Sequence, residues 1–233
     1  MAMDCVAVSL GGSFLVGENG VDVALTRDIA AVLTRASQQR RILAVVGGGA
    51  VARTYIQGAR SLGAGETALD DLGIAVTRIN ARVLLAALPK AYPLPPKDFD
   101  EAILASHTFP IIVMGGTHAG HTTDAVTVML GDRARAVRVV IATNVDGVYT
   151  SDPKKDPNAK LLPRLTHADL VRITSGGDGK AGSAGVVDAL GAKMLSRAGT
   201  ECAVVDGRDL KALESAILGR TDFHGSLIVR EGR

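Results

Sequence analysis

The chain has 233 residues, of which 47% are hydrophobic and 21% charged, values typical of a globular protein with one sizeable core. Its net charge of +2 comes from 26 basic and 24 acidic residues without a basic block, and aromatic residues make up 3%, with no Trp. Because this composition offers neither a basic surface nor stacking platforms, it argues against nucleic acid or an anionic membrane as a partner.

The first half of the chain alternates short apolar runs with helical patterns. Residues 5–10 form an apolar run that ends at Gly11, and Asp22 is a natural N-cap for the amphipathic helix that follows. The run at 42–46 is continuous, as in a parallel strand buried on both faces. The predicted strands are 5–10, 42–46 and 110–114, and the predicted helices are 22–37, 50–62, 68–88 and 98–106.

The stretch from Gly115 to Asp124 joins the apolar run 110–114 to a helical pattern that continues from Ala125. Its glycines let backbone N–H groups approach an anion, and the first turn of a helix leaves N–H donors unpaired at the positive end of its dipole. Three threonines and two histidines add side-chain donors. The stretch therefore predicts a site for a phosphate-bearing ligand.

The second half continues the alternation on both sides of a polar loop at 150–160. Thr166 and Asp169 have the spacing of a capping box, with Asp in place of the usual Glu or Gln, and they open a brief helix. Residues 176–183 are the most flexible in composition, and Gly199 is a natural left-handed helix cap. The predicted strands are 137–142, 203–205 and 227–229, and the other predicted helices are 125–130, 186–198 and 210–218.

Cys5 and Cys202 both lie in apolar runs, so we interpret them as small core residues and predict no disulfide. The N-terminus has no basic region ahead of an apolar segment, and no apolar run approaches the roughly 18 residues that span a bilayer. We therefore expect a cytoplasmic protein.

The order of strands and helices predicts an α/β fold with a mainly parallel sheet and helices on both faces. The proline-rich stretch 92–96 is too short to divide domains, so we expect one domain. Glycine turns follow four predicted strands, after Leu10, Val46, Met114 and Ala142. In open α/β sheets ligands bind beyond the carboxyl ends of the strands, so these turns should gather along one edge.

Four glycine turns are more than one phosphate group requires. A nucleoside triphosphate, or two phosphorylated ligands placed end to end, would use them all. Phosphoryl transfer needs the reacting groups held in line and their negative charge offset by N–H groups, Lys or Arg, and a metal ion. The chain lacks both the P-loop pattern and the glycine spacing of a dinucleotide fold.

Ordered motifs then point to one family. Taken together, they resemble the amino acid kinase superfamily and, within it, the archaeal-type uridylate (UMP) kinases. The resemblance runs from the first strand to the final helix. The motifs are Ser9-Leu10-Gly11-Gly12-Ser13, Val46-Gly47-Gly48-Gly49 followed by Arg53, the decapeptide 115–124, and Thr143-Asn144-Val145-Asp146-Gly147-Val148-Tyr149-Thr150-Ser151-Asp152-Pro153.

The resemblance implies a three-layer α/β/α sandwich of the amino acid kinase type, formed by residues 1–233 as a single domain. It implies transfer of the γ-phosphoryl group of ATP to the phosphate of UMP, with Mg²⁺ bound through the ATP phosphates rather than by protein ligands. The acceptor side would come from about 1–135 and the ATP side from about 136–233. The assembly would be a homohexamer.

The resemblance also assigns residues by motif to three groups. For UMP they are Gly48, Asp70, Thr117, His118, Ala119, Gly120, His121, Thr122 and Thr123. For ATP and the transferring phosphates they are Ser9, Leu10, Gly11, Gly12, Ser13, Gly49, Arg53, Thr143, Asn144, Tyr149 and Asp152. The candidate catalytic residues are Gly12, Arg53, Asp146 and Lys180.

Some of these residues have an ordinary structural interpretation as well. Asp70 and Asp71 fall in the first turn of the helix 68–88, where they could complement the helix dipole, although a carboxylate at Asp70 could also accept hydrogen bonds from ribose hydroxyls. Tyr149 could be a core aromatic residue at a hairpin. Asp146 fits either a residue that orders a lysine or metal at the reaction centre, or a turn residue before Gly147.

The resemblance includes one departure that affects the chemistry. Many members of the superfamily carry a lysine just before the first glycines, where this chain has Ser9-Leu10, as the archaeal-type uridylate kinases do. Lys180 matches the other lysine position of the superfamily, so it is our candidate for stabilising the transferring phosphoryl group. The alternative for Lys180 is a solvated loop lysine.

His118 and His121 also allow a metal-site interpretation. They lack a third nearby ligand beyond Asp124, which makes a poor zinc site, and donation to the UMP phosphate fits them better.

Two other functions remain open at this point. The same fold could act on another acceptor, such as acetylglutamate, carbamate or isopentenyl phosphate. A non-catalytic protein that binds ATP and stores metal oxoanions would also share this fold.

Overall fold

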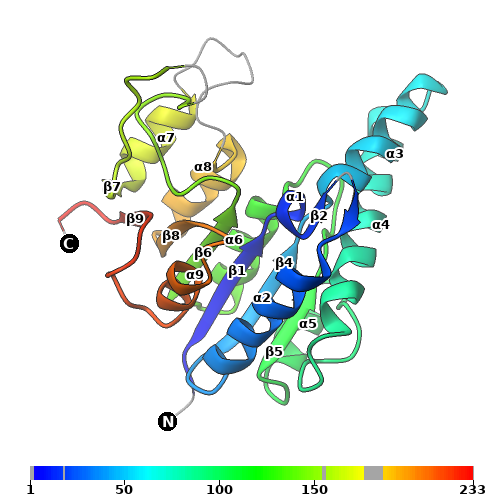
Figure 1. Cartoon of the computed structure of the whole chain (residues 1–233), viewed down its shortest axis with the longest axis horizontal. Coiled ribbons are helices and arrows are strands. Elements are labelled where there is room, and N and C mark those ends of the chain that lie inside the picture. The colour runs from blue at the N-terminus through cyan, green and yellow to red at the C-terminus, as the bar shows by residue number, and fades with distance from the viewer. Residues whose placement is uncertain (1–2, 18, 154–155, 176–185, 233) are drawn as a thin grey trace.

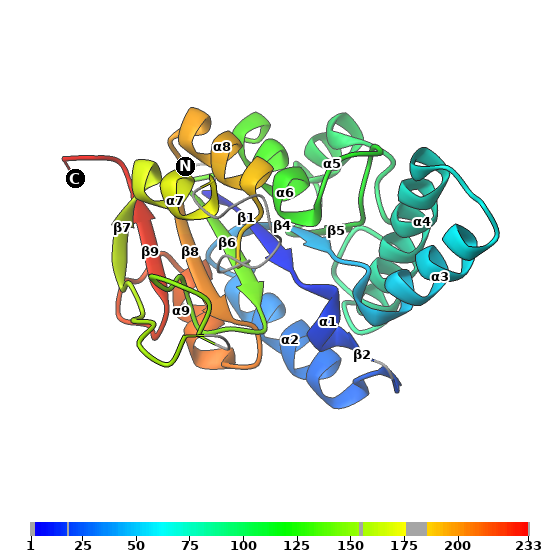
Figure 2. The ribbon, with the colours of Figure 1, turned by 90° about the horizontal axis from the view of Figure 1, so that it is seen from above.

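The computed structural model describes residues 3–17, 19–153, 156–175 and 186–232. A seven-stranded sheet forms the middle layer, in the order β5-β4-β1-β6-β8-β9-β7. Helices cover both of its faces (Figures 1 and 2). The strands are β1 (Cys5–Leu10), β4 (Arg41–Val46), β5 (Ile111–Met114), β6 (Arg138–Thr143), β7 (Arg164–Thr166), β8 (Glu201–Asp206) and β9 (Ser226–Val229).

The sheet is mainly parallel. Neighbouring strands pair in parallel throughout, except that β8 and β9 are antiparallel. The predicted α/β/α sandwich with a mainly parallel sheet is confirmed.

Helices α2 (Val23–Ala36) and α9 (Leu210–Ile217) cover one face of the sheet, and four other helices cover the opposite face (Figure 2). A packed pair, α3 (Gly49–Ser61) and α4 (Glu66–Leu85), lies at the β5 end. None of the helices within the described ranges is both long and apolar enough to cross a bilayer. The four helices of the opposite face are α5 (Phe99–Ala105), α6 (Thr123–Arg133), α7 (His167–Ser175) and α8 (Ala189–Ala198).

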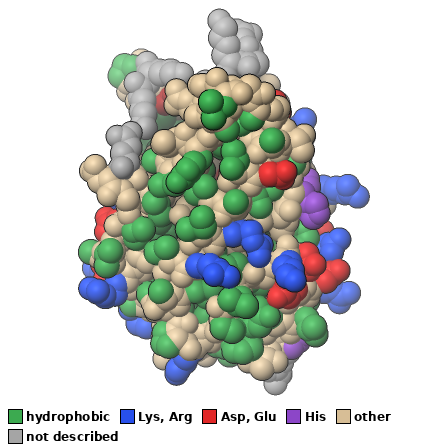
Figure 3. Space-filling model, turned by 90° about the vertical axis from the view of Figure 1, so that its right-hand side faces the viewer, with side chains coloured by type: hydrophobic (Ala, Val, Ile, Leu, Met, Phe, Trp, Pro, Cys, Tyr) green, Lys and Arg blue, Asp and Glu red, His purple; other side chains and the backbone are tan. Residues whose placement is uncertain are grey.

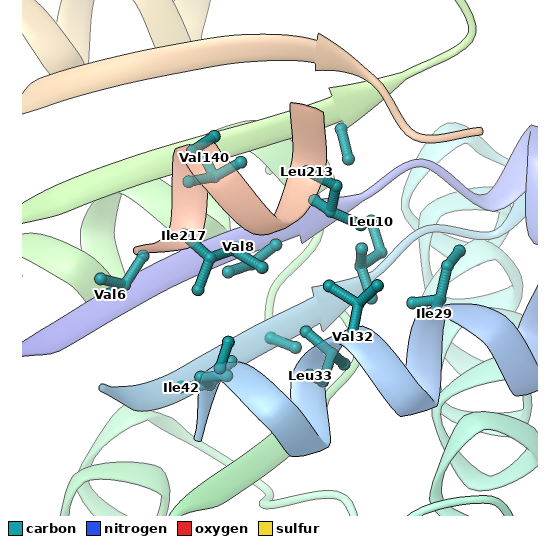
Figure 4. Packing of buried hydrophobic residues seen from close by; sticks show 14 of the residues in the cluster. Val6, Val8, Leu10, Ile29, Val32, Leu33, Ile42, Val140, Leu213 and Ile217 are labelled. Atoms are coloured by element: carbon teal, nitrogen blue, oxygen red, sulfur yellow. The ribbon is translucent and has the colours of Figure 1, made fainter. Parts of the chain in front are cut away.

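Strand β1 shows why the central strands are apolar without alternation. Its residues Val6, Val8 and Leu10 point into the core beneath α2 and α9 (Figure 4), whereas Cys5 and Ala7 belong to the core on the other face. Successive side chains of a strand point to opposite faces, so a strand covered on both sides is buried at every position and mainly apolar. Ser9 is the one polar residue of β1.

Both cysteines are free and buried, as predicted. Burial raises the pKa of Cys5 to about 11, although the nearby charge of Arg41 opposes this shift. Burial also raises the pKa of Cys202. Both thiols are therefore protonated at neutral pH and act as packing groups.

The predicted caps are confirmed. The side chain of Asp22 accepts a hydrogen bond from Leu25 N at 2.9 Å, and Gly199 adopts a left-handed φ of 62°. Thr166 and Asp169 form a reciprocal pair, in which Asp169 N donates to Thr166 Oγ1 and Thr166 N donates to Asp169 Oδ2, both at 3.1 Å. Asp therefore completes this capping box in place of Glu.

Some elements differ from the prediction. The short helix α1 (Gly12–Leu15), the hairpin of β2 (Val16–Gly17) and β3 (Gly20–Val21), and β7 were not predicted, because they are too short to show a period. Helix α4 begins at Glu66, so Asp70 and Asp71 lie beyond its first turn and the helix-dipole interpretation was wrong. Helix α8 begins at Ala189 because Asp188 caps it.

Candidate functional site

The four glycine turns meet at one edge of the sheet, as the sequence predicts. They follow β5, β4, β1 and β6, which are consecutive neighbours in the sheet. Backbone hydrogen bonds join adjacent turns: Gly11 N donates to Ala142 O and Gly47 N donates to Leu10 O, each at 2.9 Å. The turns after β4, β1 and β6 are therefore joined through their backbones.

The first two turns pack backbone against backbone. A Cβ on Gly12 would overlap Gly49 N and Gly47 O and would lie 2.5 Å from the Gly47 carbonyl carbon. Gly49, the first residue of α3, has a left-handed φ of 65°. These glycines are needed because no side chain fits between the turns.

A buried asparagine on α4 supports the second turn. Asn80 Nδ2 donates to Gly47 O at 2.9 Å and to Gly48 O at 3.1 Å. These bonds tie the carbonyl groups of the second turn to α4, and the one to Gly48 O adds to the bond that this oxygen accepts from Ala52 N. The sequence analysis missed Asn80, because an internal helix position gives no sign of a partner on a distant turn.

A first cavity, which we call the loop cavity, lies between α3, α4 and the stretch 116–123. Its volume is about 270 Å³. Of the predicted site residues it is lined by Gly48, Gly49, Asp70, His118, Gly120, His121, Thr122 and Thr123.

The loop is anchored to α4 by two hydrogen bonds. Gly120 N donates to Asp70 Oδ2 and Gly116 N donates to Thr77 Oγ1, both at 2.8 Å. Gly120 has a left-handed φ of 80°. Asp70 therefore positions the loop, a role the sequence analysis did not assign to it.

Two polar atoms of the loop are buried without a partner among the described residues. They are Thr117 Oγ1 and His121 Nδ1. A buried polar atom without a hydrogen bond costs about 1–3 kcal/mol, so both atoms favour a polar partner. The rings of His118 and His121 lie edge to face, 6.0 Å apart.

A second cavity, which we call the central cavity, lies where β1, β6, α6 and α8 meet. Its volume is about 250 Å³. It shares Thr122 and Thr123 with the loop cavity, so these two residues stand between the two cavities. Its other lining residues are Ser9, Gly11, Asp124, Ala142, Thr143, Val186 and Asp188.

Two carboxyl groups lie in the central cavity. Ser9 Oγ donates to Asp124 Oδ1 at 2.8 Å, and Thr122 Oγ1 donates to Asp188 Oδ2 at 2.5 Å. Burial raises the pKa of Asp124 to about 6, and the charge of Asp188 adds to this rise, while the Ser9 bond opposes it. The sequence analysis did not assign Asp188 to the site. Its place before a helical run was the available signal, since Asp favours N-cap positions.

The raised pKa of Asp124 predicts a pH-dependent stability. The folded protein binds the Asp124 proton more tightly than the unfolded chain does, because the carboxyl pKa of the unfolded chain is near 3.8. Above about pH 6 the ionised Asp124 therefore lowers the free energy of unfolding. This loss of stability disappears as the pH falls toward 4 and the group becomes protonated. Without nucleotide or metal, Asp124→Asn should raise the Tm at pH 8 by a few degrees, with the gain shrinking between pH 8 and pH 5.

Thermal unfolding across this pH range checks the expectation. Asp71→Asn, on the exposed side of α4, is the matched control and should leave the Tm nearly unchanged at every pH. A gain for Asp124→Asn that is constant with pH would contradict it.

A separate group of side chains follows β6. Asp146 Oδ1 accepts from Tyr149 Oη and Asp146 Oδ2 lies against His224 Nε2, each at 2.8 Å. Desolvation raises the pKa of Asp146, but the bonds from His224 and Tyr149 outweigh it and hold that pKa below its usual value. The side chain of Asp146 therefore joins Tyr149 to His224. Tyr149 is a half-buried hydrogen-bonded side chain rather than a core aromatic.

Arg208, in the turn after β8, supports the same segment. It pairs with Asp206 at 2.6 Å and donates to Asn144 O at 3.2 Å. The pairing with Arg208 lowers the pKa of Asp206. Neither Arg208 nor His224 could be placed near Asn144 or Asp146 from the sequence, because they are distant in the chain.

The remaining predicted residues have different positions. Leu10 has its side chain in the core beneath α2 and α9, so only its backbone can reach a ligand. Ser13, Arg53 and Ala119 are exposed, and none of them lines either cavity. Asp152 is half-buried in the segment after β6. Lys180 lies outside the described residues.

The part of the chain that the structure describes has no group of three or more His, Cys, Asp or Glu side chains placed to hold a metal ion. His118 and His121 therefore have no third ligand there, which disfavours the zinc alternative.

Comparison with known proteins gives consistent matches. The model of the amino acid kinase family matches residues 4–206. The uridylate kinase of Thermococcus sibiricus is 46% identical over 216 residues, which cover 92% of this chain and 96% of that protein. The uridylate kinase of Archaeoglobus fulgidus is 42% identical over 217 residues, which cover 92% of this chain and 97% of that protein.

Solved structures agree in fold. The crystal structure of uridylate kinase from Archaeoglobus fulgidus superposes with a TM-score of 0.86 at 40% identity, covering 97% of this chain and 100% of that one. The UMP kinase of Bacillus anthracis superposes with a TM-score of 0.79 at 22% identity, covering 100% of this chain and 98% of that one.

Proposed function

The chain belongs to the amino acid kinase family, and we propose that its two adjoining cavities carry out the reaction of a uridylate kinase. In this reaction the γ-phosphoryl group of ATP passes to the phosphate of UMP, which gives UDP and ADP. The observation that carries the proposal is the contact between the loop cavity and the central cavity at Thr122 and Thr123. An acceptor phosphate in the first cavity would meet a donor phosphate in the second.

The backbone supplies most of the described donors at this meeting point. The N-terminus of α3 borders the loop cavity at Gly48 and Gly49, and the N-terminus of α6 borders both cavities. Helix N-termini carry unpaired N–H groups and a positive dipole end, which suit phosphate oxygens. Groups that are already in place need no reorganisation as charge moves between the phosphates.

The UMP side of the proposal rests on the loop 117–123 and on Asp70. The unpartnered Thr117 Oγ1 and His121 Nδ1 support a phosphate near the loop. Asp70 has one oxygen on Gly120 N. We propose that its remaining lone pairs accept the ribose hydroxyls.

The ATP side rests on Thr143, Asn144, Tyr149 and Asp152. The bonds from Arg208 and within the Asp146 group support a segment held ready for a nucleotide. We propose that Mg²⁺ arrives bound to the ATP phosphates, where it offsets their charge. The residues that line the cavities are consistent with a metal ion that offsets the phosphate charge, because none of the described lining residues is Lys or Arg.

The proposed activity is tested by coupled ADP release with UMP, CMP, acetylglutamate, carbamate and isopentenyl phosphate as acceptors. Turnover should be greatest with UMP. Faster turnover with another acceptor would mean that this fold acts on a substrate other than UMP. Tight ATP binding without turnover on any acceptor would instead indicate an ATP-dependent oxoanion storage protein.

His121→Ala should raise the KM for UMP about tenfold and leave the KM for ATP nearly unchanged, because a hydrogen bond to a charged phosphate is worth about 1.5–3 kcal/mol. Steady-state kinetics in both substrates check this. His107→Ala, an exposed histidine that lines neither cavity, is the matched control. Loss of a bound zinc ion from the His121 variant would overturn the assignment.

We also propose a homohexamer in the cytoplasm, from the family resemblance. The face on the side of α3 and α4 carries scattered hydrophobic side chains (Figure 3). Tyr55 on α3, Leu62 directly after α3 and Ile79 on α4 are exposed. Scattered exposed hydrophobic side chains are also common on monomers, so the proposed assembly rests on the family resemblance. Light scattering at several concentrations tests the assembly.

A further inference from the structure

Thr122 stands between the two cavities, but its hydroxyl proton is already committed. Thr122 Oγ1 accepts from Ala125 N at 3.2 Å and donates to Asp188 Oδ2 at 2.5 Å. A hydroxyl has one proton, and an ionised carboxylate can only accept. In this arrangement the side chain of Thr122 has no proton left for a substrate phosphate.

Asp188 uses its second oxygen on its own helix. Asp188 Oδ1 accepts from Leu190 N and Gly191 N, each at 2.9 Å, and so caps α8. One carboxylate therefore joins the first turn of α8 to the first turn of α6. These helices come from the two parts of the chain to which we assign the donor and the acceptor.

The first turns of α6 and α8 also pack closely. The two helices lie side by side on the same face of the sheet (Figure 2). A Cβ on Gly191 would lie 3.3 Å from Asp124 Cβ and 3.5 Å from Ala125 N. Glycine at this position lets α8 approach close enough for Asp188 to reach Thr122.

We propose that Asp188 is a positioning residue for the phosphoryl transfer, which ties the acceptor loop to α8 through the hydroxyl of Thr122. The bond turns the Thr122 hydroxyl toward α8, so the UMP phosphate is bound by other donors of the loop. Those donors are the backbone N–H groups at the start of α6 and the side chains of Thr123 and His121. This inference rests on the proposed function.

A purely structural role for Asp188 predicts something different. If Asp188 only caps α8, its replacement should affect stability, with no dependence on the Thr122 hydroxyl. Asn caps helices about as well as Asp, so Asp188→Asn separates the two roles. Asn at this position keeps an oxygen that accepts from Leu190 N and Gly191 N. It replaces the charged oxygen that faces Thr122 with a neutral NH₂ group.

The experiment is a double-mutant cycle on the full chain, with kcat and the KM for UMP measured for Asp188→Asn, Thr122→Val and the double variant. Each single change should reduce kcat/KM for UMP about tenfold, because a hydrogen bond to a charged carboxylate is stronger than one between neutral groups. The double variant should lose no more than about twofold beyond Thr122→Val, because the bond to Asp188 is already absent in that variant, which also loses the bond from Ala125 N. Thr122→Ser, which keeps the hydroxyl, should stay within about threefold of the unaltered chain.

Stability controls complete the design. Asp188→Ala, which removes the cap, should lower the Tm, while Asp188→Asn should change it little. Asp98→Asn, at the N-cap of α5 and away from both cavities, should change neither kcat nor KM.

Two results would overturn the inference. One is an additive cycle, in which the double variant loses the product of the two single losses. The other is unchanged kinetics for Asp188→Asn. Failure of the uridylate kinase assignment itself would appear separately, as absent UMP turnover by the unaltered chain.

Discussion

Replacing Lys180 by alanine should lower kcat by about 10²–10³-fold while changing the KM for UMP much less, because the lost group would act on charge that develops in the transition state. The superfamily lysine before the first glycines is absent, and Ser9 in its place donates to Asp124. None of the described residues around the two cavities is Lys or Arg. Any positive side chain that acts on the transferring phosphoryl group, in addition to the proposed Mg²⁺, therefore comes from elsewhere in the chain.

Lys180 is our candidate by its place in the sequence, and Val186, which follows it in the chain, lines the central cavity. Steady-state kinetics at saturating ATP check the prediction. Lys193→Ala, on the exposed side of α8, is the matched control and should leave kcat unchanged. Unchanged kcat in the Lys180 variant, with a large loss in Arg53→Ala, would transfer the role to Arg53.

Gly12→Ala should cost about 1–3 kcal/mol of stability or more, because the new methyl group would overlap backbone atoms of Gly47 and Gly49. Backbone cannot move aside as a side chain does. The turns would separate, and since an error of about 1 Å can cost 10²-fold in rate, kcat/KM should fall by at least about 10²-fold. Urea unfolding and steady-state kinetics measure the two effects.

A graded series of glycine variants guards against a variant that fails to fold. At Gly11 an added Cβ would lie 3.1 Å from Phe14 Cε1 and 3.2 Å from Ala142 O, so Gly11→Ala should cause a smaller loss. Gly58, inside α3, has open space around it, and Gly58→Ala should stabilise the protein by about 0.5–1 kcal/mol. Equal effects at Gly12 and Gly58 would show that close packing of the turns is not the reason for Gly12.

Much of the fold could be predicted because local signals agreed with the tertiary structure. The run 5–10 is buried at every position and apolar except at Ser9, since β1 is covered on both faces. Asp22 and Gly199 marked helix ends by the chemistry of their own residues. Strand β7 gave no such signal, because three residues at a sheet edge with one buried side chain show no period.

The candidate site could be predicted in part. The stretch 115–124 indicated a phosphate site from glycines and a helix start alone, and the structure places a cavity beside it. The choice of UMP as acceptor came from family resemblance and not from the physics of the loop. The partners of the loop, Asp70 and Thr77 on α4, bind its backbone from a distant element, and no pattern in the sequence specifies such a pair.

The sequence by itself determined which segments become buried strands, where helices begin, and that four glycine turns lie at the carboxyl ends of parallel strands. These properties follow from hydrophobic periodicity, capping chemistry and the absence of Cβ atoms, all of which act over a few residues. Only the tertiary structure decided that Leu10 faces the core, that Asp188 reaches Thr122, and that Asp146 binds His224. Those contacts join residues far apart in the chain, and their distances depend on how closely helices and turns pack.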